Sequence, residues 1–188
     1  MKTQIFFVLG PTASGKSKFA LNLAEKLNGE IINADSMQIY RELSILTARP
    51  TLEDKKKVNH HLYGFVKGDV RFNVQKWCEE VSKKINYLVN QNITPILVGG
   101  TGLYIESLIN GIVSIPSIPE KVKIESDKMI LKIGKENFFN LVKELDSDAM
   151  INIAPNDIQR IRRIWEVNFF TKKKFSDWKK IKNKNFLN

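Results

Sequence analysis

A glycine-rich segment near the amino terminus carries a lysine and a serine at a spacing suited to phosphate binding. Residues 10–17 read Gly-Pro-Thr-Ala-Ser-Gly-Lys-Ser and fit the pattern G-x-x-x-x-G-K-[ST]. Gly10 and Gly15 let the backbone turn tightly, so that successive N–H groups point at one anion. Lys16 supplies a mobile cation for the terminal phosphate, and the Ser17 hydroxyl is placed to ligate Mg²⁺.

The surrounding sequence favours a phosphate loop over a glycine- and serine-rich turn that matches by chance. The segment follows an apolar run, Ile5–Leu9, and opens an amphipathic helix near Lys16, which is the strand–loop–helix order that the motif requires. The helix adds the positive end of its dipole. We therefore predict that the chain binds a phosphorylated ligand through Gly10, Pro11, Thr12, Ala13, Ser14, Gly15, Lys16 and Ser17.

A carboxylate, Asp35, follows the second predicted strand and is the candidate general base. Phosphate-loop hydrolases usually carry an acidic residue after a later strand to hold Mg²⁺, but the strand ending at Val98 is followed by glycines and Thr101. A carboxylate that faces a bound phosphate ester suits a base acting on an incoming nucleophile. An aspartate that caps its own loop is the alternative. Gln38 carries an amide able to read a base edge, or is an ordinary surface residue.

Two further polar motifs are ambiguous from the sequence. Thr101 lies in a Gly-Gly-Thr-Gly turn, where the backbone can approach a ligand closely, and a purely structural turn is the competing interpretation. We do not interpret His60-His61 as a metal site, because adjacent side chains diverge and no further His or Cys cluster completes a coordination set.

Positive charge is concentrated at the carboxyl-terminal end. The net charge is +10, and residues 160–188 hold three Arg and seven Lys against Glu166 and Asp177, which gives +8 there and +2 for the rest. This asymmetry indicates an anionic polymer as partner, with a solvated lysine-rich tail as the alternative for residues 172–188. Arg160 and Arg163 share a helix face with Arg162 beside them, which favours contact with a polyanion.

Short apolar runs alternate with amphipathic segments and position these residues. The pattern predicts strands at residues 2–9, 30–33 and 94–98 and helices at 16–27, 74–89 and 103–109. Strands that alternate with helices indicate an α/β fold with a mainly parallel sheet. Ligands of such sheets bind beyond the carboxyl ends of the strands, so the loops 10–17, 34–38 and 99–102 are expected to converge on one site.

Pro116 and Pro119 mark the predicted boundary between a core, residues 1–115, and a helical region, residues 116–188. In the second region one helix face is expected to hold Phe138, Leu141, Val142 and Leu145. A last helix opens at Asn156-Asp157, where either side chain can cap it, and runs to about Phe169 with Ile158, Ile161 and Trp165 on its buried side. The chain then ends in a polar, lysine-rich stretch without a closing strand.

Length and composition exclude several classes of protein. A chain of 188 residues with 43% hydrophobic residues is long enough for one domain with a small appendage. A single cysteine, Cys78, excludes a disulfide framework and a thiolate metal site and is expected to be buried filler. Ile5–Leu9 is too short for a signal peptide, and no apolar run approaches the ~18 residues of a membrane span. We expect a cytoplasmic protein.

Taken together, the motifs resemble the tRNA dimethylallyltransferases, also called tRNA isopentenyltransferases or IPP transferases. Four blocks match in order, and His60-His61-Leu62 matches a further element. The blocks are Gly-Pro-Thr-Ala-Ser-Gly-Lys-Ser (10–17), Ala-Asp-Ser-Met-Gln-Ile-Tyr (34–40) with Thr-Ala-Arg-Pro (47–50), Val-Gly-Gly-Thr-Gly-Leu-Tyr (98–104), and Pro-Asn-Asp-Ile-Gln-Arg-Ile-Arg-Arg (155–163). The resemblance covers nearly all of the chain and implies a P-loop NTPase-like parallel sheet flanked by helices, with a C-terminal helical subdomain.

The resemblance also implies a reaction. Dimethylallyl diphosphate donates its five-carbon group to the exocyclic N6 amine of the adenosine just 3′ of the anticodon, after the adenine leaves its stack. The phosphate loop, Lys16 and Mg²⁺ hold the diphosphate, Asp35 takes a proton from the amine, and Thr101 hydrogen-bonds the reacting region. The tRNA-contacting residues that the resemblance implies are Asp35, Ser36, Met37, Gln38, Thr101, Lys123, Gln159, Arg160, Ile161, Arg162 and Arg163.

The chain departs from the family pattern at several positions. Leu46 stands where the family usually has Gly, Ser147 where Pro is common, Ala154 where His is common, and Lys123 where Arg is frequent. Family chains continue past this C-terminus into a further helical part, so we expect a chain that is truncated relative to the family.

Three other functions stay open at this point. They are a P-loop small-molecule kinase that binds ATP, a transferase acting on free adenine nucleotides, and an inactive remnant that only binds nucleotide or RNA. The missing Mg²⁺-binding acid and the lack of a lid with paired arginines argue against the kinase. The segment Gln159–Arg163 favours tRNA over a mononucleotide. The expected partners are therefore tRNA and dimethylallyl diphosphate, with ATP as an alternative ligand, for a monomer that does not contact membranes.

Overall fold

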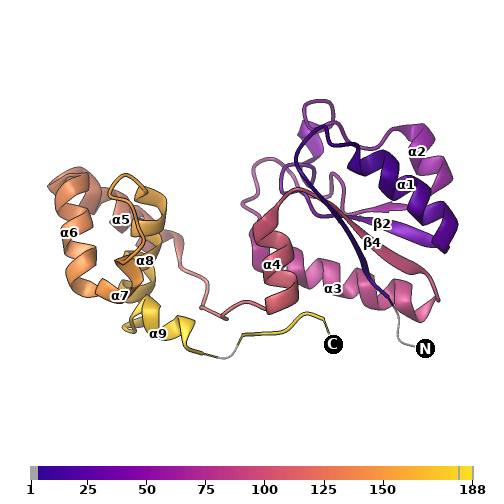
Figure 1. The fold of residues 1–188 in the computed structure, drawn as a ribbon. Coiled ribbons are helices and arrows are strands. Elements are labelled where there is room, and N and C mark those ends of the chain that lie inside the picture. Colours follow the sequence, from indigo (N-terminus) through magenta and orange to yellow (C-terminus); the bar gives the residue numbers. More distant parts are fainter. Residues whose placement is uncertain (1–3, 182, 188) are drawn as a thin grey trace. The chain divides into compact units, whose positions relative to one another are not determined.

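The computed structural model of the chain divides into two compact units, residues 1–112 with 185–188 and residues 113–184 (Figure 1). The structure describes residues 4–181 and 183–187. The first unit contains the sheet, and the second is helical. Within the described part of the chain, no helix has both the length and the apolar character needed to cross a membrane.

A four-stranded parallel sheet forms the centre of the first unit, in the order β1-β4-β2-β3. The strands are β1 (Phe6–Leu9), β2 (Gly29–Asn33), β3 (His60–His61) and β4 (Thr94–Gly99). The central strand β4 reads as a nearly continuous apolar run, and the apolar pair Ile31-Ile32 of β2 is buried beside it, because helices cover both faces of a parallel sheet. The predicted α/β fold with a parallel sheet is confirmed. The first predicted strand is shorter than expected, and its residues 2 and 3 lie outside the described part.

Side chains that alternate along the strands divide the core of this unit into two layers. Ile31 and Ile96 pack against α1 (Lys16–Leu27), whereas Ile32 and Leu97 pack against α3 (Val74–Asn90) and α4 (Gly102–Asn110). The remaining helices of the unit are the short η1 (Arg41–Leu43) and α2 (Leu52–Lys57). The predicted bounds of α1 and of the start of α3 are confirmed, because both helices bury a continuous apolar face.

Buried contacts of α3 hold the sheet layer together. The Trp77 ring stacks on Tyr104 with 4.4 Å between centroids, and its indole N–H donates to the Asn33 carbonyl oxygen at 3.1 Å. Cys78 is fully buried, as expected for filler, and burial raises the pKa of its thiol to about 12. The Ser82 hydroxyl donates to the Phe186 carbonyl oxygen at 2.8 Å, so the end of the chain packs in this unit.

The second unit is a helical cluster of α5 (Glu120–Ile133), α6 (Lys135–Leu145), α7 (Ser147–Met150), α8 (Ile158–Thr171) and α9 (Phe175–Lys179). Phe138, Val142 and Trp165 lie in its core, whereas Leu145 is 43% exposed, so the predicted face of α6 is narrower than expected. Of the two candidate caps for α8, Asp157 accepts from the Arg160 N–H at 3.2 Å.

The helix α9 lies where the sequence indicated only a polar stretch. A buried carboxylate, Asp146, holds its start by accepting from the Ser176 N–H at 3.0 Å. Burial by itself would raise the pKa of Asp146, but the hydrogen bonds from Ser176 and Ala149 outweigh it and lower this pKa. The predicted tail at residues 172–188 therefore begins as ordered structure, and Lys182 and Asn188 lie outside the described residues.

Candidate functional site

A cavity of about 320 Å³ lies beyond the carboxyl ends of β2 and β4. Three predicted loops contribute to its wall, which includes Lys16, Ser17, Asp35, Gln38 and Gly99. The parallel sheet brings these loops together, because the carboxyl ends of its strands share one edge. The expected convergence of residues 10–17, 34–38 and 99–102 is therefore observed, although Thr101 does not lie on the cavity wall.

The segment between β1 and α1 has the backbone shape of an anion-binding loop. Ala13 and Gly15 adopt left-handed conformations, with φ of 63° and 80°, and such reversals turn successive N–H groups inward. Gly15, the N-cap residue of α1, has no side chain to cap the helix, so an anion can bind the first N–H groups of this helix. The Lys16 ammonium donates to the Pro11 carbonyl oxygen at 2.5 Å and so lies on the loop itself.

Asp35 combines a structural role with an open position at the cavity. Its Oδ1 accepts from the backbone N–H groups of Met37 at 2.8 Å and Gln38 at 3.4 Å. The loop-capping alternative is therefore correct for one oxygen, while Asp35 also lines the cavity. Within the described part of the chain, Oδ2 has no hydrogen-bond partner. One oxygen orients the carboxylate, and the other is available to a ligand.

Asn33 is a residue of the site that the sequence interpretation missed. It is fully buried at the end of β2, and its amide donates to the carbonyl oxygens of Asp35 at 2.9 Å and Leu62 at 3.1 Å. Its Oδ1 accepts from the Asp35 N–H at 2.9 Å. A polar residue that ends the apolar run Ile31-Ile32 is the signal that marks it, since buried amides need partners.

Thr101 joins the turn after β4 to the Asp35 loop. Its hydroxyl oxygen accepts from the Ser36 N–H at 2.9 Å and donates to the Ser36 hydroxyl at 3.3 Å. The same two segments touch at Gly99, where an added Cβ would lie 2.2 Å from the Ala34 carbonyl atoms. The catalytic role expected for Thr101 stays a prediction, and the contacts that it makes here position the loop of the carboxylate.

Tyr63 and Gln38 also line the cavity. The Gln38 side-chain amide donates to the Thr47 carbonyl oxygen at 2.7 Å and so fastens the following loop. Burial, with a further contribution from the charge of Asp35, raises the pKa of Tyr63 well above its usual range. Tyr63 was not identified from the sequence, where it follows the His60-His61 pair without a motif of its own. Leu46, which stands where the family usually has Gly, is 83% exposed.

The adjacent histidines make separate structural contacts. His61 Nε2 lies 2.5 Å from Glu30 Oε2, and Asn59 donates to the other Glu30 oxygen at 2.6 Å. Burial by itself would raise the pKa of Glu30. The hydrogen bonds and the His61 charge outweigh this effect, so the pKa of Glu30 is lowered. His60 Nδ1 lies 2.8 Å from the Val58 carbonyl oxygen. In the described residues no three His, Cys, Asp or Glu side chains form a group able to hold a metal.

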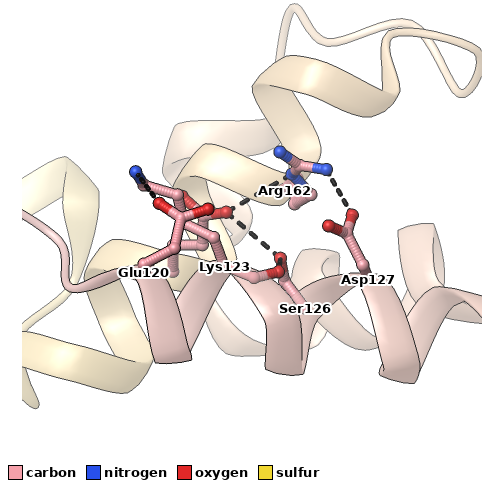
Figure 2. Close-up of polar contacts among 6 residues, drawn as sticks. Glu120, Lys123, Ser126, Asp127 and Arg162 are labelled. Atoms are coloured by element: carbon pink, nitrogen blue, oxygen red, sulfur yellow. Dashed lines mark hydrogen bonds and ion pairs between the residues drawn. The ribbon is translucent and has the colours of Figure 1, made fainter. Parts of the chain in front are cut away.

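The helical unit separates the predicted RNA-contacting residues into two sets. Arg162 forms ion pairs with Asp127 and with Glu166, whose Oε1 lies 3.3 Å from Arg162 Nε (Figure 2). Glu166 is 5% exposed and also accepts from the Ser126 hydroxyl at 3.1 Å. The Arg162 guanidinium therefore links α8 to α5, and the expected contact of Arg162 with RNA stays a prediction. The Ile161 side chain is fully buried in the core of the helical unit.

The second set remains at the surface. Gln159, Arg160 and Arg163 are exposed, and both arginines line one cavity, which confirms that they share a helix face. Arg160 Nε lies 3.3 Å from Asp157 Oδ2. Lys123, with a side chain 26% exposed, pairs with Glu120 at 2.7 Å (Figure 2). Arg160 and Lys123 can therefore exchange an internal acid for an external phosphate.

Comparison with known proteins identifies the family to which the chain is similar. The family model described as IPP transferase matches residues 38–187. The tRNA dimethylallyltransferase of Pelagibacter ubique is 46% identical over 177 residues, which are 94% of this chain and 56% of that protein. The corresponding protein of Parvibaculum lavamentivorans is 42% identical over 174 residues, 93% of this chain and 55% of the relative. This chain thus spans about half the length of the curated relatives it matches.

Solved structures agree with the sequence relatives. A eukaryotic dimethylallyltransferase acting on tRNA has a TM-score of 0.81 and 28% identity, covering 99% of this chain and 47% of that one. A full-length tRNA isopentenylpyrophosphate transferase from Bacillus halodurans has a TM-score of 0.58 and 32% identity, covering 90% of this chain and 56% of that one.

Proposed function

This chain belongs to the IPP transferase family, and from that premise we propose that it transfers a dimethylallyl group to tRNA. The donor is dimethylallyl diphosphate, and the acceptor is the exocyclic N6 amine of the adenosine 3′-adjacent to the anticodon. One observation carries the proposal: the phosphate-loop residue Lys16 and the carboxylate Asp35 line the same cavity. A single ligand can therefore contact both groups at once.

The phosphate loop supplies the site for the diphosphate. The left-handed residues Ala13 and Gly15 and the uncapped start of α1 present N–H groups, which stabilise the charge that develops on a leaving diphosphate. Lys16 exchanges its contact with the Pro11 carbonyl oxygen for a phosphate oxygen. This exchange is favourable because an ion pair replaces a hydrogen bond to a neutral acceptor.

The residues at the cavity fit a hydrated Mg²⁺. This ion takes few protein ligands when phosphate oxygens and water supply the others, and the Ser17 hydroxyl on the cavity wall is a suitable oxygen ligand. When bound, Mg²⁺ neutralises negative charge on the diphosphate. Ser17 would hold the ion, and Lys16 would share the charge of the same phosphates.

Asp35 is placed to remove the proton of the attacking amine. The N6 nitrogen forms a bond to the first carbon of the dimethylallyl group, and the bond from that carbon to oxygen breaks. The electron pair leaves with the diphosphate, and the N6 proton passes to Asp35 Oδ2. The N–H groups of Met37 and Gln38 hold Oδ1, so the accepting oxygen is oriented before the adenine enters. The adenine must leave its stack to reach this cavity.

The remaining partner assignments follow from this reaction. The tRNA anticodon loop is the macromolecular partner, and the exposed Gln159, Arg160 and Arg163 are candidates to contact its backbone, with Lys123 as a further cation. We infer a monomer that acts where tRNA is used, in the cytoplasm. The segment Asp35–Gln38 is the part of the chain proposed to meet the base, and Thr101 adjoins it through its hydrogen bonds to Ser36.

Labelled dimethylallyl diphosphate tests the proposal. The purified chain is incubated with unmodified tRNA, with AMP, with ATP and candidate acceptors, and without an acceptor. We expect label on the tRNA, reduced at least about a hundredfold in Asp35→Asn, as general-base catalysis contributes ~10²–10⁴-fold. The control Asp69→Asn removes an exposed carboxylate outside the cavity and should retain the parent rate.

Each other outcome overturns the proposal in a specific way. Label on AMP alone would identify a transferase for free nucleotides. Phosphoryl transfer from ATP would identify a kinase. Binding of tRNA without transfer of the label would show that the chain only binds RNA.

A further inference from the structure

The helical unit contains a second hollow that the proposed reaction does not use. It has a volume of about 350 Å³, which lies at the lower end of the ~300–1,000 Å³ that small-ligand sites occupy. Arg160 and Arg163 from the first turns of α8, Lys179 from α9, and Asn152 and Ile153 from the preceding loop line it. Its size suits one nucleotide rather than a whole helix or strand.

Positive charge outweighs negative charge around this hollow. Arg160 pairs with Asp157 at 3.3 Å, whereas Arg163 makes no ion pair within the described part of the chain and is only acted on by the charge of Glu166. The Lys179 ammonium lies 5.3 Å from the centre of the Phe175 ring, and among the described residues it forms no ion pair. Both arginines are near the amino-terminal end of α8, where the helix dipole adds positive potential. An anionic group is therefore attracted to this place.

The floor of the hollow is apolar. Ile153, Ile164, Ala149 and Phe175 contribute to the lining, and Asn152 adds a side-chain amide. A free phosphate would satisfy the cations and leave this floor uncovered. An unstacked base covers apolar side chains, stacks on aromatic rings, and offers edges to an amide.

We propose that this hollow binds one unstacked nucleotide of the RNA substrate, with its phosphate on Arg160, Arg163 and Lys179 and its base over Ile153 and Phe175. The inference rests on the proposed function, which supplies the RNA. It assigns Asn152, Phe175 and Lys179 to recognition and leaves Arg162 out, because that arginine is paired with Asp127 and Glu166.

A charge substitution at Asn152 tests the hollow without altering the core. Asn152 is exposed, so Asn152→Glu keeps the fold and brings a negative charge to the bound phosphate. The matched control is Asn140→Glu, which adds the same charge at an exposed position of α6 outside the hollow. The full chain is titrated with an RNA hairpin that has a single-stranded loop, and with the same hairpin carrying one abasic loop nucleotide at a time.

We expect RNA binding to depend on Asn152 and on one base of the loop, with effects that are not additive. We expect Asn152→Glu to weaken binding about tenfold, as loss of a stacked base does, and Asn140→Glu to change it less than about twofold. One abasic position should weaken binding by the parent about tenfold and have little further effect in Asn152→Glu, since contacting groups are not additive. Arg163→Gln should lower the salt slope by about 1.

The outcomes separate this inference from the proposed reaction. Equal binding by the parent and Asn152→Glu overturns the nucleotide site and leaves the prenyl transfer standing. Weakened binding by every abasic hairpin alike also overturns it. If RNA binding changes as expected but no label is transferred, the nucleotide site is supported and the proposed reaction is overturned. A parent chain that binds no RNA overturns both.

Discussion

The Thr101 hydroxyl accepts a hydrogen bond from the Ser36 backbone N–H at 2.9 Å, which joins two loops that are 65 residues apart in the chain. Ser36 directly follows Asp35, so this bond limits how far the carboxylate loop can move. The hydroxyl uses its donor and one of its two acceptor lone pairs in this contact. We therefore expect Thr101 to affect the proposed reaction through the position of Asp35.

Thr101→Val removes these bonds while keeping the side-chain shape. We expect the free energy of unfolding to fall by about 1 kcal/mol, and kcat to fall about tenfold or more because the base is less well oriented. The KM for dimethylallyl diphosphate should stay unchanged, since Thr101 does not line the cavity. Thr101→Ser restores the hydroxyl and should recover most of kcat. A serine variant as slow as the valine variant would contradict a positioning role.

The close packing of Gly99 gives a prediction about stability. An alanine Cβ there would lie 2.2 Å from the Ala34 carbonyl carbon and oxygen, and backbone atoms cannot move aside cheaply. Gly99→Ala should lower the free energy of unfolding by about 3 kcal/mol, the upper end for overpacking. Gly102→Ala is the control, because an added Cβ there meets nothing within 4 Å. Urea unfolding of both variants is the measurement, and equal midpoints would disprove the steric argument.

Local signals explain why much of the sheet unit was predictable. The helix at Lys16–Leu27 follows a motif that defines its start, and the helix at Val74–Asn90 repeats apolar residues along one face. Asp35 was identified because it follows a short strand beside a phosphate loop. Each of these features depends on residues that are close together in the sequence.

The features that were missed depend on distant partners. Asn33 contacts Leu62, 29 residues away, and Arg162 contacts Asp127, 35 residues away. Three arginines in four positions look alike in sequence, and only the packing of α5 on α8 turns Arg162 inward. The helix α9 was missed because Asp146, outside the helix itself, holds its first turn. Tertiary context outweighs local composition at these places.

The ion pairs of Arg162 predict a different response from that of Arg163. Arg162→Gln leaves the Glu166 carboxylate, which is 5% exposed, without its cation, so we expect a loss of about 1–3 kcal/mol in unfolding free energy. The double variant Arg162→Met with Glu166→Gln should recover part of this loss, since no charge remains buried. The salt slope of RNA binding should stay near the parent value. A salt slope lowered by about 1, as expected for a phosphate contact, would show that Arg162 contacts RNA.

The buried carboxylate of Asp146 predicts a dependence of stability on pH. Hydrogen bonds from Ser176 and Ala149 lower its pKa in the folded protein below the ordinary value of 3.8, despite the opposing effect of burial. The unfolded state therefore binds the proton more readily, and the stabilisation is fully present above pH ~4 and is lost as the pH falls through the folded pKa. Asp146→Asn should remove this acid-induced loss and lower the free energy of unfolding at pH 7 by about 1–3 kcal/mol. Thermal unfolding of both proteins between pH 2 and 7 measures the difference, and parallel curves across that range would show that Asp146 does not hold α9 through its charge.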